Sequence, residues 1–292
     1  MNISVPKGTY VVAVSGGVDS MCLLHMLMAY KTPQHAYVVA HAHHGIRDDA
    51  DQDEALVRNT AEQLGLPYEV GYLQLGKQAS EEAARATRYI FLRAIAKKYK
   101  AQAIITAHHK DDIVETILLH VQRGTGRSGL TPMTAQDVLR PLLNIPKSDL
   151  LLYAKKHTIA WYEDSTNKND RYARNKIRHL LCQKDAHSIT DKVYALYEQM
   201  LPINNEIDEL VTELYNSVNK NMSLKRSQFV VLPYAVQKEI VHMWLKNASI
   251  PNINKVMIER ATVACKILRP GKKMSLEHNR FLVSARQSVK IL

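Results

Sequence analysis

Short apolar runs alternate with longer segments of helical periodicity through the first part of the chain. The apolar runs are rich in β-branched and aromatic residues, which favour strands. They are TYVVAV at 9–14, HAYVVAHA at 35–42, PYEVGYL at 67–73 and AQAIITAHH at 101–109. The segments between them, at 19–31, 49–65 and 80–99, predict helices. This alternation predicts an α/β fold with a parallel sheet and helices on both of its faces.

The pattern changes after about Arg178. Residues 190–221 show a long helical periodicity that Pro202 is expected to break, and residues 227–247 predict another helix. The last stretch, 272–292, has the pattern of a small β-hairpin. We therefore expect two domains, an α/β domain at 1–183 and a smaller, mostly helical domain with a terminal hairpin at 184–292.

Composition and charge narrow the class of protein. Lys and Arg total 39 against 28 Asp and Glu, which gives a formal net charge of +11 and a pI near 9.4 and favours a polyanion partner such as nucleic acid. The apolar stretch MCLLHMLMAY is about half a membrane span and no basic leader precedes it, so we expect a cytoplasmic protein with no membrane partner. Cys22, Cys182 and Cys265 show no CxxC spacing, which argues against disulfides and against a zinc or iron–sulfur site.

The segment SGGVDS, from Ser15 to Ser20, follows the first predicted strand and opens a predicted helix. Its glycines, Gly16 and Gly17, permit a positive φ and a close approach of backbone N–H groups to a ligand, and the helix N-terminus adds its dipole. Phosphate is the usual occupant of such a concavity. Asp19 repels a bare phosphate but becomes a ligand when Mg²⁺ lies between them. The alternative is a tight turn in which Asp19 caps the helix.

More polar side chains follow the second and fourth predicted strands. Because ligands of parallel sheets bind beyond the carboxyl ends of the strands, we expect Ser15, His41–His44 and His108–Asp112 at one rim. Asp112 and Glu115 share a helix face, where they need a cation, either Mg²⁺ or the ammonium of a substrate; the alternative is acids that complement a helix dipole. A transition-metal cluster of the rim histidines is a further alternative, which a loop shaped for a polyphosphate disfavours.

Arginines accompany these segments. Arg85 and Arg88 lie one turn apart on the helix predicted at 80–99, where an ion pair between Glu81 and Arg85 is the plainer interpretation. The glycine-rich RGTGRSGL predicts a mobile loop that carries Arg123 and Arg127. In RYARNKIR, basic residues recur every three or four positions, as a solvated charge run or as a contact with RNA phosphate. That stripe consists of Arg171, Arg174 and Arg178.

The motifs together resemble a known family. SGGVDS resembles the loop of the N-type ATP pyrophosphatases, the PP-loop superfamily, which split ATP between its α- and β-phosphates and adenylate a carbonyl oxygen. Further motifs follow in order: HAHHGIR at 41–47, EEAARATRY at 81–89, AHHKDDIVET at 107–116, RGTGRSGL at 123–130, RPLL at 140–143 and EDSTNKNDRYARNKIR at 163–178. With the loop, this series resembles the tRNA(Ile)-lysidine synthetase family across roughly the first three-fifths of the chain.

The resemblance implies a fold and a reaction. The fold is a parallel-sheet, adenine nucleotide alpha hydrolase-like PP-loop ATPase domain, followed by a smaller, mostly helical domain that binds tRNA. The reaction is that of a ligase, which uses ATP and Mg²⁺ to adenylate C2 of the wobble cytidine in an isoleucine tRNA with a CAU anticodon. Free lysine then attaches at C2, AMP and pyrophosphate leave, and the tRNA decodes AUA instead of AUG. Members of the family are often homodimers.

The resemblance also implies roles for numbered residues. The residues expected to bind ATP are Ser15, Gly16, Gly17, Val18, Asp19, Ser20, His41 and His108, with Mg²⁺ near Asp19. The residues expected to act in catalysis are Asp19, Arg85, Asp112 and Glu115, and the base that accepts the proton of lysine stays open between the last two. The residues expected to contact tRNA or substrate are Arg88, Arg123, Arg127, Arg171, Arg174 and Arg178.

Three other functions stay open. A PP-loop tRNA thiolase uses the same adenylation, but such enzymes usually carry paired cysteines. A small-molecule ATP pyrophosphatase ligase shares the loop but not the basic stripe, and a non-catalytic tRNA-binding protein would keep only the nucleotide fold. As a separate hypothesis, Arg269, Lys272 and Lys273 form a basic contact with tRNA.

Overall fold

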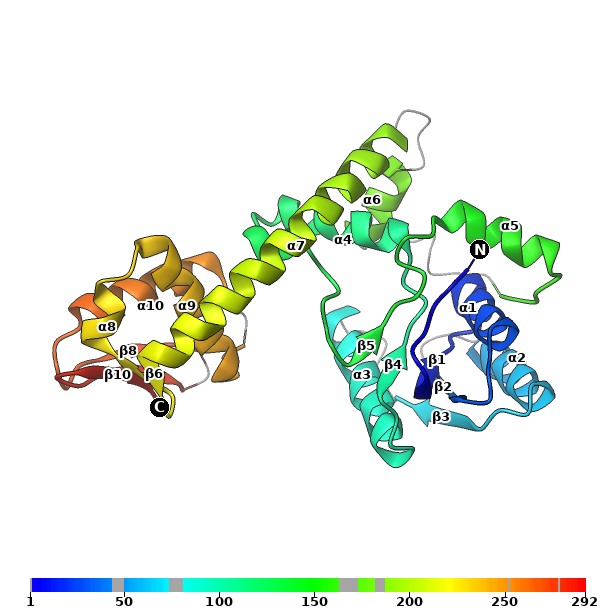
Figure 1. Ribbon diagram of the computed structural model, residues 1–292, viewed down its shortest axis with the longest axis horizontal. Coiled ribbons are helices and arrows are strands. Elements are labelled where there is room, and N and C mark those ends of the chain that lie inside the picture. The colour runs from blue at the N-terminus through cyan, green and yellow to red at the C-terminus, as the bar shows by residue number, and fades with distance from the viewer. Residues whose placement is uncertain are drawn as a thin grey trace. The chain divides into compact units, whose positions relative to one another are not determined.

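The computed structural model describes residues 2–43, 50–73, 81–162, 173–181, 187–251, 253–277 and 279–292. It divides into two compact units, Met1–Met200 and Leu201–Leu292 (Figure 1). The division falls inside helix α7 (His187–Val218), whereas the sequence placed the domain boundary between 183 and 184. The change of periodicity near Arg178 therefore lies shortly before the start of this long helix.

The first unit is built on a parallel sheet. Its strands are β1 (Gly8–Ala13), β2 (His35–His43), β3 (Tyr68–Tyr72), β4 (Ala103–Ile105) and β5 (Val138–Leu139). They are ordered β3-β2-β1-β4-β5, and all of their pairings are parallel. The parallel sheet predicted from the alternating pattern is confirmed. Strand β5, with only two residues, was not predicted.

Helices cover both faces of this sheet, with α1 (Val18–Ala29), α2 (Ala50–Gln63) and α5 (Lys147–Lys156) on one face and α3 (Glu81–Lys98) on the other. Helices α4 (Lys110–Gln122) and α6 (Ala173–Leu181) pack against each other. Because successive strand residues point to opposite faces, Tyr10 and Val12 of β1 pack in one core with α1, α2 and α5. Val11, between them, packs in a second core with Leu92 and Ile95 of α3. This arrangement fixes the carboxyl ends of the strands between the two helical layers.

Two helix predictions were wrong in segments that contain a proline. Helix α7 continues through Pro202, because a proline removes one backbone hydrogen bond and a long helix with a packed face tolerates that loss. The helix predicted at 227–247 is divided into α8 (Arg226–Val230) and α9 (Tyr234–Asn247). Pro233 is the N-cap of α9 and has no N–H to continue α8, so it separates the two helices.

The second unit combines helices with an antiparallel sheet. Helices α8, α9 and α10 (Lys255–Ile267) accompany the strands β6 (Asn219–Lys220), β7 (Ser223–Lys225), β8 (Lys273–Ser275), β9 (Phe281–Ser284) and β10 (Ser288–Ile291). The strand order is β6-β7-β10-β9-β8. Strands β9 and β10 pair where the sequence indicated a hairpin, and β7 and β8 extend that pair into a larger sheet.

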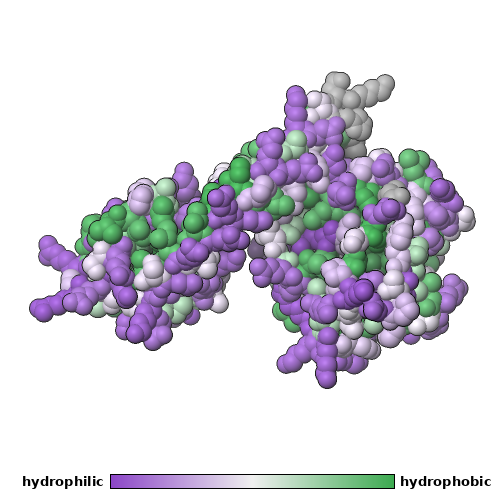
Figure 2. All heavy atoms as spheres, in the orientation of Figure 1, coloured by the Kyte–Doolittle hydropathy of each residue, from purple (hydrophilic) through white to green (hydrophobic). Residues whose placement is uncertain are grey.

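The core of the second unit centres on Trp244, whose side chain is fully buried and whose Nε1 donates to the backbone oxygen of Met222 at 3.2 Å. The second unit exposes apolar side chains, and Figure 2 shows hydrophobic green over part of its visible surface. Its exposed apolar side chains include Val230, Val231, Val256, Val263 and Ile267. Among the residues that the structure describes, none of the helices combines the length and apolarity of a membrane span.

Candidate active site

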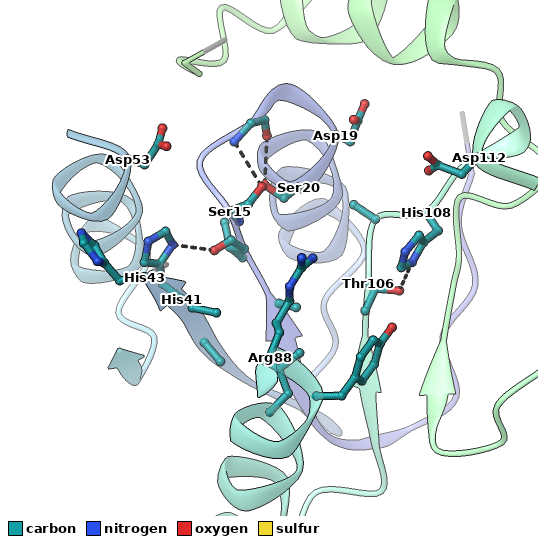
Figure 3. A pocket seen from close by; sticks show the side chains of 18 residues that line it. Ser15, Asp19, Ser20, His41, His43, Asp53, Arg88, Thr106, His108 and Asp112 are labelled. Carbon is teal, nitrogen blue, oxygen red and sulfur yellow. Dashed lines mark hydrogen bonds between the residues drawn. The ribbon is translucent and has the colours of Figure 1, made fainter. Parts of the chain in front are cut away.

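A cavity of about 280 Å³ lies at the carboxyl ends of β1, β2 and β4 (Figure 3). Helices α1, α2, α3 and α4 supply the rest of its lining. The polar residues that line it are Ser15, Asp19, Ser20, His41, His43, Asp53, Arg88, Tyr89, Thr106, His108 and Asp112. The sequence predicted one rim formed by the loop, the second strand and the fourth strand, and these residues lie together as expected. His44 belongs to that expected rim but lies outside the described residues.

The loop from Ser15 to Ser20 is held in one shape by its own hydrogen bonds. Ser20 Oγ donates to the Gly17 carbonyl at 2.9 Å and accepts from the Ser15 N–H at 3.1 Å. Gly16 adopts φ +89°, in the left-handed region that favours glycine, and a Cβ there would lie 2.9 Å from Asp53 Oδ1. The loop thus turns directly into α1, whose N-terminal N–H groups suit a phosphate.

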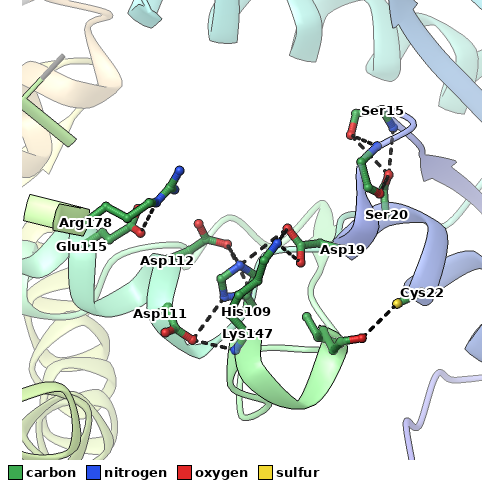
Figure 4. Close-up of polar contacts among 12 residues, drawn as sticks. Ser15, Asp19, Ser20, Cys22, His109, Asp111, Asp112, Glu115, Lys147 and Arg178 are labelled. Atoms are coloured by element: carbon green, nitrogen blue, oxygen red, sulfur yellow. Dashed lines mark hydrogen bonds and ion pairs between the residues drawn. The ribbon is translucent and has the colours of Figure 1, made fainter. Parts of the chain in front are cut away.

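Asp19 does not cap helix α1. The N-cap residue is Gly17, with no side-chain hydrogen bond at the cap, and the Asp19 carboxylate instead binds Lys147, whose Nζ lies 2.5 Å from Oδ1 and 2.6 Å from Oδ2 (Figure 4). Val18 is buried in the core, so only its backbone is available to a ligand. The helix-cap alternative for Asp19 therefore does not hold.

His109 links the carboxylates at the start of α4. Its Nε2 lies 3.7 Å from Asp19 Oδ2 and 3.4 Å from Asp112 Oδ2, and its Nδ1 lies 3.5 Å from Asp111 Oδ2. Burial opposes protonation of the imidazole, but the neighbouring carboxylates outweigh it and raise the pKa of His109. The Lys147 ammonium thus lies against the Asp19 carboxylate, and the raised pKa of His109 favours its protonated form between the carboxylates (Figure 4).

Two further histidines at the cavity, His41 and His108, are neutral at pH 7. His41 Nδ1 donates to the Val14 carbonyl at 2.8 Å, and burial lowers the pKa of His41. His108 Nδ1 lies 2.7 Å from Thr106 Oγ1, and burial lowers the pKa of His108 to about 4. These side chains therefore line the cavity as neutral hydrogen-bonding groups and do not act as cations for a polyphosphate.

Asp112 and Glu115 share a face of α4 but have different surroundings. Asp112 lines the cavity and accepts from the His109 N–H at 3.0 Å. Glu115 is only 3% exposed and is held by two bonds from Arg178, Nε to Oε1 at 2.8 Å and Nη2 to Oε2 at 3.0 Å. Burial raises the pKa of Glu115, although Arg178 opposes that shift. The carboxylate that faces the cavity is that of Asp112.

The predicted arginines are distributed over several places. Arg88 lines the cavity, whereas Arg85 is not among the lining residues and lies over the ring of Tyr89, 5.1 Å from its centroid. Arg123 is exposed at the C-cap of α4, and Arg127 begins a single 3-10 turn in the segment predicted as a mobile loop.

Two arginines of the basic stripe, Arg174 and Arg178, lie on α6 and contact α4. Arg174 donates from Nη2 to Thr116 Oγ1 at 3.2 Å, and Arg178 binds Glu115. These contacts argue against a merely solvated charge run at these two positions. Arg171 and the segment from Glu163 to Asn167 lie outside the described residues.

Sequence reasoning missed Lys147 and did not assign roles to His109, Asp111 and Asp53. The segment NIPKSDLL carries a helix-start signal, Pro146 followed by an acid in the first turn of α5. That signal places Lys147 at a helix start but not beside Asp19, which is 128 positions away in sequence.

The donor set at the rim fits Mg²⁺. Among the described residues, no three His, Cys, Asp or Glu side chains gather as a metal cluster of their own. Mg²⁺ commonly takes one or two carboxylates and completes its shell with water and substrate phosphates. Asp19 and Asp112, both at the cavity and both next to His109, offer that kind of partial oxygen shell.

Known proteins resemble this chain. A family model described as a PP-loop domain matches residues 2–185. The tRNA(Ile)-lysidine synthase of Ralstonia nicotianae is 40% identical over 190 residues, 61% of this chain and 41% of the relative. That of Mycoplasma mycoides is 34% identical over 254 residues, 84% of this chain and 62% of the relative. The chain spans about half the length of the curated relatives that it matches.

A solved structure shares the fold. The U34-tRNA thiolase NcsA from Methanococcus maripaludis superposes with a TM-score of 0.54 at 17% identity, over 68% of this chain and 74% of that one. Family, fold and site geometry agree, since the SGGVDS loop at the end of β1 lines the cavity as the sequence predicted. The chain belongs to the PP-loop domain family.

Proposed function

We propose that the chain is an ATP-dependent ligase that forms lysidine at the wobble cytidine of an isoleucine tRNA with a CAU anticodon. The observation that carries the proposal is the Ser15–Ser20 loop at the N-terminus of α1, with Asp19 and Asp112 at the same cavity. The curated relatives with the name tRNA(Ile)-lysidine synthase support this choice of reaction over others of the family.

The first step transfers AMP to the RNA base. The C2 oxygen of cytidine attacks the α-phosphorus of ATP, the bond from that phosphorus to the β-bridging oxygen breaks, and pyrophosphate leaves. Ser15, Gly17 and Ser20 hold the phosphates with hydroxyl and backbone N–H groups. Mg²⁺, when held by Asp19 and Asp112, offsets charge on the phosphates.

The second step replaces the adenylate with lysine. The ε-amine attacks C2, the C2–O bond breaks, AMP leaves with that oxygen, and the amine gives up a proton. Neutralising a lysine with a pKa of about 10.4 at pH 7 costs roughly 4.6 kcal/mol. Asp112 faces the cavity while Arg178 occupies Glu115, so we assign the first contact with the ammonium to Asp112.

The RNA contacts of the proposal are basic side chains of both units. Arg88 lies at the cavity, where it would meet the base or its phosphate. Arg269, Lys272 and Lys273 of the second unit are exposed, and we propose that this unit binds tRNA through them. The homodimer and the cytoplasmic location expected from the sequence stay predictions.

The test is a single-turnover reaction of ATP labelled with ³²P at its α-phosphate, with tRNA(Ile) carrying CAU and Mg²⁺. Without lysine, label should join the tRNA as pyrophosphate is released; with lysine, AMP should appear together with lysidine. No pyrophosphate release would refute the proposal. Turnover that requires a sulfur donor, or ammonia and no tRNA, would assign a thiolase or a small-molecule ligase instead.

The thiolase alternative has little support among the described cysteines. Cys22 and Cys265 are buried, and burial raises the pKa of each thiol to about 12. A sulfur carrier needs an accessible thiolate, which neither of these residues offers. Cys182 lies outside the described residues.

A further inference from the structure

Helices α1 and α5 lie side by side in a parallel register. Every third residue along α1 contacts every third residue along α5, in the same order. The contacting pairs are Asp19–Lys147, Cys22–Leu150 and His25–Tyr153. Because the register is parallel, the first residue of α5 lies beside Asp19, which lines the cavity in the phosphate loop.

The backbone of Lys147 is fixed, but its ammonium is not enclosed. Its N–H donates to Asp111 Oδ2 at 2.8 Å, and the carbonyl of Ile145, two residues before it, accepts from the Lys110 N–H at 3.0 Å. The side chains of Lys147 and Asp19 are 35% and 29% exposed. A flexible four-carbon stem on an anchored backbone allows the ammonium to change partners without moving the helix.

A polyphosphate in the cavity would change the balance at Asp19. The ammonium of Lys147 contacts both oxygens of that carboxylate, at 2.5 and 2.6 Å. A metal ion that accompanies the phosphates needs at least one of these oxygens, so metal and ammonium compete for them. The ammonium displaced from Asp19 would lie next to incoming phosphate oxygens, which are its natural acceptors.

We propose that Lys147 is a phosphate-binding residue that exchanges Asp19 for the pyrophosphate half of the nucleotide. In the free protein its charge neutralises Asp19 and keeps that carboxylate from repelling the ligand. In the complex the same charge binds the β- and γ-phosphates and remains on pyrophosphate as it departs. The inference rests on the proposed function only in taking a nucleotide polyphosphate as the ligand.

The test measures binding of inorganic pyrophosphate to the full chain by calorimetry, in EDTA, without tRNA or lysine. We expect Lys147→Met to weaken binding at least tenfold and Lys147→Arg to stay within threefold of the unsubstituted chain. Lys98→Met is the matched control, because Lys98 also binds a carboxylate, Glu69 at 2.7 Å, but lies in the last turn of α3 and not at the cavity. It should leave the affinity unchanged within twofold.

Exchange is tested by Asp19→Asn. This variant should bind pyrophosphate more tightly in EDTA. The factor by which Asp19→Asn raises the affinity should be at least threefold larger in the chain that keeps Lys147 than in the Lys147→Met background, measured with the Asp19→Asn, Lys147→Met double variant. Equal gains would mean that Asp19 acts by repulsion alone and would overturn the exchange. If Lys147→Met lowers only the unfolding midpoint, the pair is structural and the inference is wrong.

Different results would refute the proposed lysidine reaction and the proposed role of Lys147. Pyrophosphate binding needs no tRNA, so a chain that forms no lysidine can still support Lys147 as a phosphate ligand. A chain that forms lysidine but binds pyrophosphate equally well with Lys147→Met would keep the proposed function and lose the inference. Absence of pyrophosphate binding to the unsubstituted chain also overturns the inference, whereas the turnover assay judges the reaction.

Discussion

Arg178 of α6 encloses the carboxylate of Glu115 on α4 with two parallel hydrogen bonds, Nε to Oε1 at 2.8 Å and Nη2 to Oε2 at 3.0 Å. Such a fork fixes both position and orientation of the two groups. The pair joins α6 to the helix that carries Asp112 to the cavity. Glu115 is therefore a support for this helix in the free protein.

Removing Arg178 alone should destabilise the first unit more than removing both partners. Arg178→Met leaves the Glu115 carboxylate buried without its main cation, which should cost about 2 kcal/mol, because the arginine itself is partly exposed. The Glu115→Gln, Arg178→Met double variant should recover part of that loss in urea unfolding. Arg93→Met is the control, since its pair with Asp137 is about half exposed on both sides and should cost less than about 1 kcal/mol. A double variant no more stable than Arg178→Met would contradict this view of the pair.

Asp112→Asn should abolish lysine transfer and leave the fold intact. The amide keeps the shape of the side chain but can neither attract an ammonium nor accept its proton, so lysidine formation should fall by at least about 100-fold. The measurement is single-turnover lysidine formation, with the unfolding midpoint as the test of the fold. Asp137→Asn is the matched control, because Asp137 pairs with Arg93 near the surface and does not line the cavity. Near-normal turnover of Asp112→Asn would refute the role.

Local patterns predicted the parallel sheet and part of its rim, while contacts between distant segments could not be predicted. The strand that ends before Ser15 and the one that ends before His108 are apolar runs whose parallel pairing follows from the helices between them. The Lys147–Asp19 and Arg178–Glu115 contacts join residues 128 and 63 positions apart. Which of many lysines and arginines meets a given carboxylate depends on helix packing, and no periodicity encodes it.

Gly16→Ala should damage the phosphate loop more than a comparable substitution elsewhere. A side chain at φ +89° is strained by about 1–2 kcal/mol, and its Cβ would also press on Asp53 at 2.9 Å. We expect ATP affinity to drop at least tenfold in equilibrium binding. Gly65→Ala is the control for backbone strain alone, because Gly65 also has a positive φ, +63°, but has open space around its Cβ position. Equal ATP affinity in the two variants would argue against a shaped loop.

His108 should titrate far below an ordinary histidine. Burial is the main reason that the pKa of His108 falls from 6.5 to about 4, and nearby arginines add to it while Asp112 opposes. Between these pH values His108 is protonated in the unfolded chain but neutral in the folded chain. Its contribution to the free energy of unfolding is therefore fully present above about pH 6.5 and is lost as the pH falls toward 4. NMR titration of the ring should show the low pKa, with His108→Gln to assign the signal. The same variant should flatten the decline in unfolding free energy, and an observed pKa near 6.5 would show that the ring is solvated.

The exposed cations of the second unit should contribute to tRNA affinity through counterion release. Arg269, Lys272 and Lys273 are all exposed, and each phosphate that they neutralise frees condensed cations, which steepens the dependence of affinity on salt. Replacing all three with glutamine should weaken tRNA binding and lower the slope of log affinity against log salt by about 1 to 3. Lys97, Lys98 and Lys100, exposed near the end of α3, give a control of equal charge in the first unit. If both triple variants change the slope equally, the tRNA responds to net charge and the second unit is not a specific contact.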